Sequence, residues 1–223
     1  MRSSAGKIEL TGFDDLFQTG GETVQEVPLS ELFPFKDHPF HVRDDEAMQK
    51  TVDSIARSGV LSPGIVRPRP EGGYEIIAGH RRKRGSELAG KATMPVLVRD
   101  LDDDEATIIM VDSNLQREKI LPSEKAFAYK MKVDALKHQG ARNDRTSARG
   151  VPKLQARDQV ALDAGEKSHM AVTRYISLTK LIPSLLTMVD EEKLSVSTAA
   201  DYISVLTEDE QIDLASVMDK LGV

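Results

Sequence analysis

The sequence contains no cysteine and no tryptophan, and aromatic residues make up only 4% of its 223 residues. The lack of cysteine excludes disulfide bonds, thiolate metal sites and cysteine nucleophiles, and it is typical of a reducing cytoplasm. No hydrophobic run approaches the length of a membrane-spanning helix, and the first residues lead into no apolar signal core. We therefore expect a cytoplasmic protein without a membrane segment.

Charge is abundant but unevenly distributed along the chain. Charged residues reach 30% and hydrophobic residues 39%, with a formal net charge of −6. This composition is enough for a core and predicts a helix-rich protein with a large solvated surface. The length is that of one large domain or two small ones.

The first half of the chain predicts an α+β domain. Residues 1–23 have few bulky apolar groups and are expected to form a flexible tail. Strand and helix patterns then alternate as far as residue 118. The expected strands are 24–27, 64–69, 74–78 and 94–99, the expected helices are 29–32, 44–58, 81–89 and 102–115, and 34–43 is expected to be an irregular loop.

Strand patterns disappear after residue 118, so we expect residues 119–223 to form a second, all-α domain. Two glycines, one proline and few large apolar groups predict a linker at 140–155. The expected helices are 121–139, 157–164, 169–181, 183–189, 196–206 and 208–221.

The stretch "GYEIIAGHRRKRGSELAG", residues 73–90, places five basic or titratable residues directly after a strand pattern. A glycine such as Gly79 lets the backbone approach a ligand closely, and the helix that follows offers unpaired N–H groups to an anion. Arg81 and Arg82 add guanidinium groups suited to phosphate oxygens. These residues therefore predict an anion cradle, and the alternative is a helix start that is only solvated.

Three further stretches occur with this turn in a fixed order. They are "HPFHVR" (38–43), "GVLSPGIVRP" (59–68) and "DSNLQREKILPSEKAFAY" (112–129). Together the four stretches resemble the N-terminal domain of the ParB and Noc chromosome- and plasmid-partition family. The resemblance covers about residues 24–200. It implies a CTP-binding α+β domain related to sulfiredoxin, followed by an all-α helix-turn-helix DNA-binding domain.

The resemblance also implies a nucleotide site and a metal site. In the family the G-E-R-R turn contacts the phosphates and an E-N pair helps to hold Mg²⁺, so Asn114 is the expected metal-side residue. Matched position by position, the nucleotide-binding residues are Arg43, Ser62, Pro63, Gly79, His80, Arg81, Arg82, Asn114, Gln116 and Arg117.

The chain departs from the family pattern at positions that matter for chemistry. His80 and Ser113 stand where the family usually has glutamate, and His41 stands where it has glutamine. A serine hydroxyl is a much weaker Mg²⁺ ligand than a carboxylate, so metal-assisted hydrolysis is in doubt and a weak CTPase activity stays an open question. Asp112, one residue away, is an alternative carboxylate.

Residues 156–181 follow the logic of a helix-turn-helix unit. Ala161 and Gly165 are four residues apart, as the small residue and the turn glycine of that unit usually are. Between Lys137 and Lys180 there are nine Lys or Arg and four Asp or Glu, a local positive excess in an acidic chain. The alternative is two packed helices without DNA contact. The residues expected to reach DNA are Lys167, Ser168, His169, Thr173, Arg174 and Ser177.

Taken together, these observations favour a partition protein associated with the nucleoid or a plasmid. It would bind a palindromic centromere-like site on double-stranded DNA, and CTP with Mg²⁺ would close two self-associated copies into a clamp. A ParA-type ATPase is the partner that the resemblance implies for the N-terminal tail. The alternatives are a transcriptional regulator that needs no nucleotide and, third, a nuclease of the same fold. The family's C-terminal dimerisation segment has no counterpart before Val223. Three interpretations stay open: a shortened form, a divergent member and a partner-dependent protein.

Overall fold

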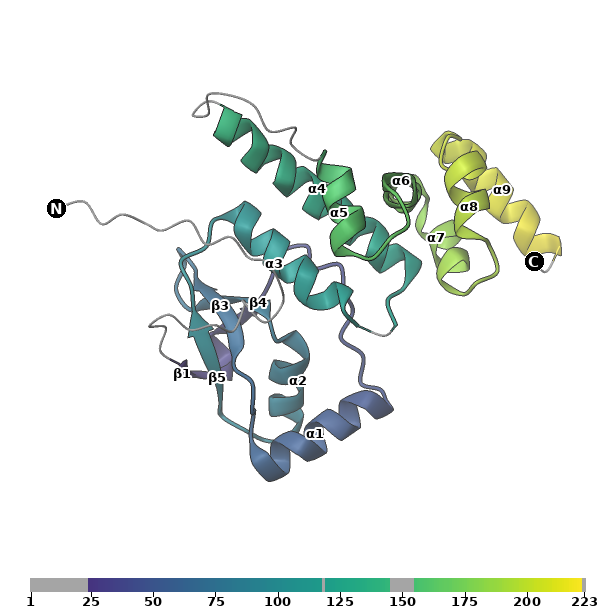
Figure 1. The fold of residues 1–223 in the computed structure, drawn as a ribbon. Helices are drawn as coiled ribbons and strands as arrows, with labels where there is room; N and C mark the ends of the chain where they lie inside the picture. Colours follow the sequence, from purple (N-terminus) through teal and green to yellow (C-terminus); the bar gives the residue numbers. More distant parts are fainter. Residues whose placement is uncertain (1–23, 118, 145–154, 222–223) are drawn as a thin grey trace.

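The structure is a computed structural model that describes residues 24–117, 119–144 and 155–221 (Figure 1). The predicted tail at 1–23 and most of the predicted linker lie outside these residues. The strands are β1 Val24–Pro28, β2 Leu32–Pro34, β3 Gly64–Pro68, β4 Tyr74–Ala78 and β5 Thr93–Val98. The helices are α1 Glu46–Ser58, α2 His80–Leu88, α3 Asp103–Leu115, α4 Pro122–Asp144, α5 Ala156–Asp163, α6 His169–Ser177, α7 Pro183–Asp190, α8 Val196–Thr198 and α9 Glu208–Leu221. The prediction of an α+β domain followed by helices is confirmed.

The strands form one mixed sheet in the order β1-β5-β3-β4-β2. β3 pairs antiparallel with β4, as the Gly72-Gly73 turn predicts, and parallel with β5. β2 was not expected, because the sequence predicts a helical turn ending at Leu32 and a loop from residue 34. Three residues are too few to show a strand period. β2 exists because it pairs in parallel with β4, so its conformation is decided by a tertiary contact.

Both faces of the sheet are buried, which explains the continuous apolar runs of its central strands. Ile65 and Ile77 pack with Ala106 and Met110 of α3 in one core. Their neighbours Val66 and Ile76 lie in a second core with residues of β1 and β5. Successive residues of a strand point to opposite faces, so one short strand supplies both cores.

The ends of α1 are set by local sequence. The Asp45 carboxylate accepts a hydrogen bond from the Met48 N–H at 2.8 Å, and Gly59 ends the helix with φ +70°. This is the N-cap and C-cap pattern that relieves unpaired backbone groups at helix ends.

Helix α4 is the central helix of the second half (Figure 1). Its Ala128 packs in the same core as α3, while Tyr129 and Val133 pack with Val160 of α5 and Val172 of α6. α4 continues to Asp144, so the predicted linker begins later than expected.

Two predicted helices are interrupted. The helix expected at 169–181 ends at Ser177 and continues as a 3₁₀ turn at Leu178–Lys180. The helix expected at 196–206 becomes a π-helical turn at Ala199–Ile203, where the Ser204 N–H donates to the Ala199 carbonyl five residues back. The backbone tightens into a 3₁₀ turn in the first place and widens into a π-helical turn in the second. Leu178 and Ile203 stay buried in the C-terminal core.

Candidate functional sites

A cavity of about 230 Å³ opens where the N-terminus of α2 meets the last turn of α3. It is bounded by the carboxyl end of β4, by the start of β3 and by the 38–42 segment. Its lining residues are His38, Val42, Ile65, Ala78, Gly79, His80, Arg81, Arg82, Ser113, Asn114 and Arg117. None of these eleven residues is acidic, and three carry guanidinium groups.

Gly79 makes the sharp entry into α2 possible. It is the N-cap residue, with φ +118°, a conformation that side chains strongly disfavour. A Cβ at this position would stand 3.2 Å from the Cα of Gly64 and 3.4 Å from the Arg82 guanidinium. The glycine therefore lets the end of β4 approach the start of β3, and the first residues of α2, whose N–H groups have no partner within the helix, line the cavity.

The three arginines of the cavity are not equivalent. Arg82 donates two hydrogen bonds of 2.6 Å from Nη1 to the carbonyl oxygens of Ser62 and Pro63, so part of its guanidinium holds the loop before β3. The pKa of Arg117 is lowered by burial and by the nearby Arg81. Like charges held this close repel each other, and an anion placed between them would relieve that repulsion.

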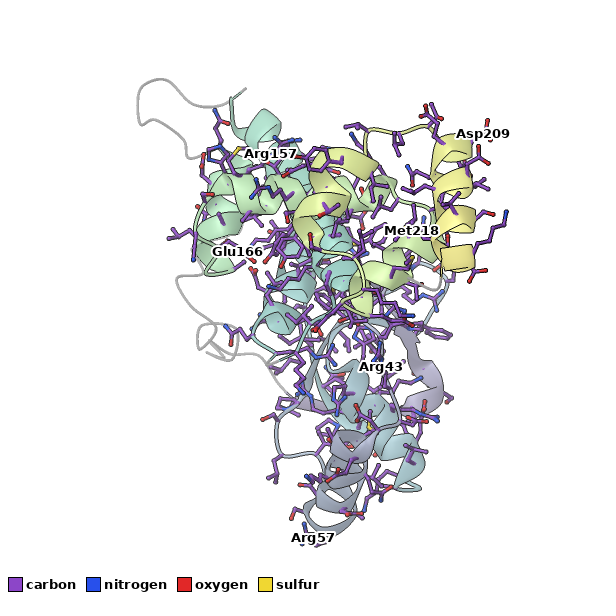
Figure 2. The ribbon with its side chains drawn as sticks, turned by 90° about the vertical axis from the view of Figure 1, so that its right-hand side faces the viewer. Arg43, Arg57, Arg157, Glu166, Asp209 and Met218 are labelled. Atoms are coloured by element: carbon purple, nitrogen blue, oxygen red, sulfur yellow. The ribbon has the colours of Figure 1, made fainter. Side chains whose placement is uncertain are left out.

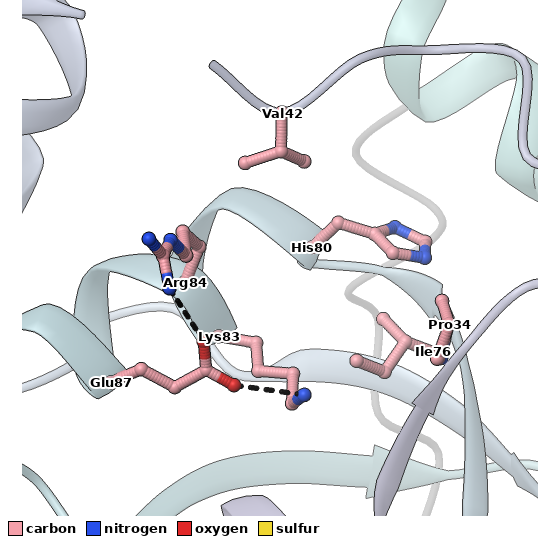
Figure 3. A pocket seen from close by; sticks show the side chains of 7 residues that line it. All are labelled: Pro34, Val42, Ile76, His80, Lys83, Arg84 and Glu87. Carbon is pink, nitrogen blue, oxygen red and sulfur yellow. Dashed lines mark hydrogen bonds and ion pairs between the residues drawn. The ribbon is translucent and has the colours of Figure 1, made fainter. Parts of the chain in front are cut away.

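The basic run beyond Arg82 has structural partners. Lys83 forms an ion pair with Glu87 at 2.9 Å, and Arg84 pairs with Asp44 at 2.5 Å. Both residues line a separate cavity of about 200 Å³, together with Pro34, Val42, Ile76, His80 and Glu87 (Figure 3). They are thus ion-paired rather than only solvated.

His80 has a structural role that the sequence did not predict. The Phe35 N–H donates to His80 Nε2 at 3.3 Å, and the ring lies 3.9 Å, centroid to centroid, from the ring of His38. Burial, followed by the nearby His38 and basic side chains, lowers the pKa of His80 to about 3. His80 is therefore neutral at pH 7 and acts as a hydrogen-bond acceptor.

His38 completes this pair. Its Nδ1 lies 2.8 Å from the Phe40 carbonyl oxygen, so the neutral ring donates there and leaves a lone pair on Nε2. Burial also lowers the pKa of His38. Within the described part of the chain, Nε2 is buried without a hydrogen-bond partner. Two neutral histidines thus line one wall of a cationic cavity.

The side of the cavity expected to hold a metal offers weak ligands. The Ser113 hydroxyl and the Asn114 amide both donate to the Met110 carbonyl, at 2.9 and 2.8 Å. Asp112 does not supply the missing carboxylate, because it pairs with Lys132 at 2.5 Å and is not a lining residue. Among the described residues, no group of three His, Asp or Glu side chains could hold a metal ion. These residues do not fit a metal held by the protein alone.

Some of the predicted nucleotide-binding residues lie outside the cavity lining. Arg43 is exposed and lies where the sheet domain meets the helices (Figure 2). Gln116 is exposed, and Ser62 and Pro63 take part only through the carbonyls that Arg82 binds. His38 and Val42 were missed, although they begin and nearly end the "HPFHVR" segment.

The same segment is tied to the start of α4 by a buried carboxylate. Glu124 accepts a hydrogen bond from the His41 N–H at 2.8 Å and another from the Leu121 N–H at 3.1 Å. The loop that covers the cavity is therefore held against the junction between α3 and α4.

The expected helix-turn-helix unit consists of α5 and α6, joined by the 164–168 turn in which Gly165 has φ +66°. α5 and α6 bury Val160, Ala161 and Val172 against α4. Figure 2 shows Arg157 and Glu166 on this part of the molecule. Glu166 points back to α4, where its carboxylate accepts a hydrogen bond from the Tyr129 hydroxyl at 2.8 Å.

The six residues expected to reach DNA lie on the turn and on α6. Lys167 and Ser168 are exposed, and His169 lies 3.1 Å from Asp158. Arg174 pairs with Asp201 at 3.2 Å. The hydroxyls of Thr173 and Ser177 donate to carbonyls one turn earlier in the same helix, which leaves their oxygen lone pairs available as acceptors.

Comparison with known proteins places this architecture in a family. The model of the ParB N-terminal domain matches residues 15–115. The chain is 31% identical over 209 residues to a nucleoid occlusion protein of Listeria monocytogenes, covering 94% of this chain and 67% of that one. It is 36% identical over 190 residues to the probable chromosome 1-partitioning protein ParB of Deinococcus radiodurans, covering 85% and 58%.

Among solved structures, the chain resembles the C-terminally truncated chromosome-partitioning protein ParB of Caulobacter crescentus complexed to the centromeric parS site. The TM-score is 0.52 at 25% identity, over 89% of this chain and 93% of that one. Fold and sequence thus define a ParB-type N-terminal domain continued by a helical region. The chain belongs to the ParB family, which includes the nucleoid occlusion proteins.

The chain spans 66 to 69% of the length of its Listeria relatives and 58% of the Deinococcus protein.

In the parts of the chain that the structure describes, no helix is long and apolar enough to cross a membrane.

Proposed function

We propose that this chain is a DNA-partition protein that binds a specific site on double-stranded DNA and binds CTP in the cavity at the start of α2. The observation that carries the nucleotide proposal is the cavity itself. Three guanidinium groups and the N-terminus of α2 converge on it, and none of its lining residues is acidic. A polyanion such as a triphosphate matches that charge.

The proposal that the bound nucleotide is CTP, rather than another nucleoside triphosphate, rests on the family resemblance. The proposed dependence on Mg²⁺ rests on the phosphates of the nucleotide. Asn114 is the residue that we assign to the metal side. Because no carboxylate lines the cavity, we expect Mg²⁺ to reach it with the phosphates of the nucleotide and to be held mainly by them. Hydrolysis should then be slow or absent.

DNA binding is assigned to the 164–168 turn and α6. Lys167 and Arg174 are exposed cations of this turn and helix, and Ser168 and His169 begin the helix that would enter the major groove. The structure of a relative in complex with the centromeric parS site supports the proposal that this chain binds DNA.

Closure of two copies into a clamp, and a ParA-type ATPase as partner, complete the proposal. Self-association would be measured by sedimentation with CTP, with DNA and with both. The expected contact with the ATPase falls on residues 1–23, outside the described residues.

The nucleotide proposal is tested by titrating a fluorescent CTP analogue with Mg²⁺, using ATP, GTP and UTP as competitors. Arg81→Ala should weaken binding about 10- to 100-fold, since hydrogen bonds to charged groups contribute roughly 1.5–3 kcal/mol. The matched control is Lys83→Ala, which removes a cation from the same helix but outside this cavity. Absence of CTP binding at millimolar concentration, with and without DNA, would refute it.

A second function is favoured by a specific observation. Arg82 is partly engaged by the Ser62 and Pro63 carbonyls, and the metal side has no carboxylate. A transcriptional regulator that needs no nucleotide would tolerate both features. Salt-sensitive, sequence-specific DNA binding that CTP leaves unchanged would favour it. Mg²⁺-dependent DNA cleavage that Asn114→Ala abolishes would instead indicate a nuclease.

A further inference from the structure

Lys132 of α4 is a fully buried lysine whose position is not explained by either candidate site. Its side chain is 1% exposed. Buried lysines are rare unless they are paired, because removing an ammonium group from water is costly. Lys132 must therefore be held by groups that justify its burial.

Two carboxylates from different helices hold it. Lys132 Nζ lies 2.5 Å from Asp112 Oδ1 of α3 and 2.5 Å from Asp163 Oδ2 of α5. The other oxygen of Asp163 accepts a hydrogen bond from Gln159 at 2.7 Å. We call these three charged residues, Asp112, Lys132 and Asp163, the clasp.

Each carboxylate adjoins one of the candidate sites. Asp112 immediately precedes Ser113 and Asn114, which line the cavity. Asp163 is the last residue of α5, directly before the turn that leads to Lys167 and α6. A displacement at either end would strain or break one of the two ion pairs.

The packing of α4 against α3 and α5 does not require the clasp. Apolar contacts already join α4 to α3 through Ala128 and to α5 through Val133. Buried ion triads can often be replaced by apolar residues of similar volume without loss of stability, whereas removal of one partner is strongly destabilising. Their best-attested advantage is that they specify one arrangement among several.

We propose that Lys132 is a positioning residue that couples the two sites. Through Asp112 it sets where Ser113 and Asn114 stand in the cavity, and through Asp163 it sets the end of α5 before the turn. Occupancy of one site then changes the affinity of the other, by the same factor in both directions. This inference rests on the proposed binding of nucleotide and DNA.

The test compares the wild-type chain with a triple variant, Asp112→Leu, Lys132→Met and Asp163→Leu, which replaces the clasp by apolar residues. The affinity for a fluorescent CTP analogue is measured without DNA and with a saturating duplex enriched from a random library by the wild-type chain. The ratio of the two affinities is the coupling factor. Thermal unfolding confirms that the variant folds.

For the wild-type chain we expect the two affinities to differ by about fivefold or more, which is the lower end of the usual range for linked sites. In the folded triple variant the coupling factor should fall to within about twofold of one, although neither site has lost a lining residue. Lys130→Met, which removes an exposed lysine of the same helix, should keep the wild-type factor. If the triple variant misfolds, Asp112→Asn and Asp163→Asn, which each weaken one half of the clasp, should each reduce the factor.

The outcomes separate the two proposals. A wild-type chain that binds neither ligand, or only DNA, refutes the nucleotide function and with it the coupling. A wild-type chain that binds both with a coupling factor of one overturns the coupling alone. So does a triple variant, or the pair of single variants, that keeps the full wild-type factor.

Discussion

The cavity at α2 and the outer surface of α6 are the two sites that we propose for anions, and they differ in how their cations are held. In the cavity, Arg82 and Arg117 are partly buried, and Arg82 also holds the backbone before β3. On the α5–α6 unit, Lys167 and Arg174 are exposed and lie outside the packed core. The groups of the first site therefore also stabilise the fold, whereas those of the second site lie on its surface.

This difference makes a general prediction about mutations. Substitutions of Gly79 and Arg82, the cavity residues that also hold the fold, should change stability and ligand binding together. Substitutions on the α6 surface should change binding alone. The four experiments below test that contrast, from the largest expected effect to the smallest.

Gly79→Ala should have the largest effect, a loss of about 3 kcal/mol in the free energy of unfolding. A Cβ at φ +118° is strained, and it would also press on the Gly64 backbone at 3.2 Å. The measurement is urea denaturation, with Gly90→Ala as the matched control. Gly90 also has a positive φ, +67°, but has no atom within 4 Å of the added Cβ. Equal losses for both variants would mean that the close approach at Gly79 is unimportant.

Arg82→Ala should destabilise the fold by about 2 kcal/mol and also weaken nucleotide binding. The substitution leaves two carbonyl oxygens without their charged donor. Arg81→Ala, by contrast, should lower nucleotide affinity at nearly unchanged stability. If Arg82→Ala were as stable as the wild-type chain, the claim that the cavity is part of the fold would fail.

Stability should fall as the pH is lowered, because the folded chain keeps His80 neutral. The pKa of His80 is about 3 in the folded state, against about 6.5 in an unfolded chain. Between these values the unfolded chain binds a proton that the folded chain does not, so stability is lost on acidification. From pH 6.5 to pH 5 the expected loss is about 1.5 kcal/mol.

His80→Gln is the control for this pH dependence, since glutamine can still accept the Phe35 N–H but does not titrate. Its denaturation midpoint should vary less between pH 6.5 and pH 5 than that of the wild-type chain. An unchanged slope would assign the pH dependence to other groups.

Lys167→Ala should have the smallest effect, a loss of about 1 kcal/mol in DNA affinity at unchanged stability. If Lys167 contacts a phosphate, the slope of log affinity against log salt should also fall by about one. Lys50→Ala, which removes an exposed lysine of α1, should change neither quantity. A large loss of stability in Lys167→Ala would remove the contrast between the two sites.

Much of the fold could be predicted because it follows from local signals. The caps of α1, the turn between β3 and β4 and the glycine before α2 all depend on residues near in sequence. β2 could not be predicted, because three residues become a strand only by pairing with β4. The break after Ser177 depends in the same way on burying Leu178 in the C-terminal core.

The candidate site was predicted in part for the same reason. The segment Gly79–Arg82 is contiguous, so its residues had to meet. Asp112 was a plausible metal ligand from its place beside Ser113, and the structure instead directs it to Lys132, twenty residues further along the chain. The roles of His38 and His80 likewise depend on a ring contact that sequence spacing does not reveal.

By itself, the sequence determined that a glycine-led helix rich in cations follows a buried strand, because that arrangement depends on neighbouring residues. Only the tertiary structure decided which cations face the cavity, which ones are paired, and which carboxylate holds the buried lysine. Those outcomes depend on distances between segments far apart in sequence. Burial and pairing are set there, and these determine whether a charge is available to bind a ligand.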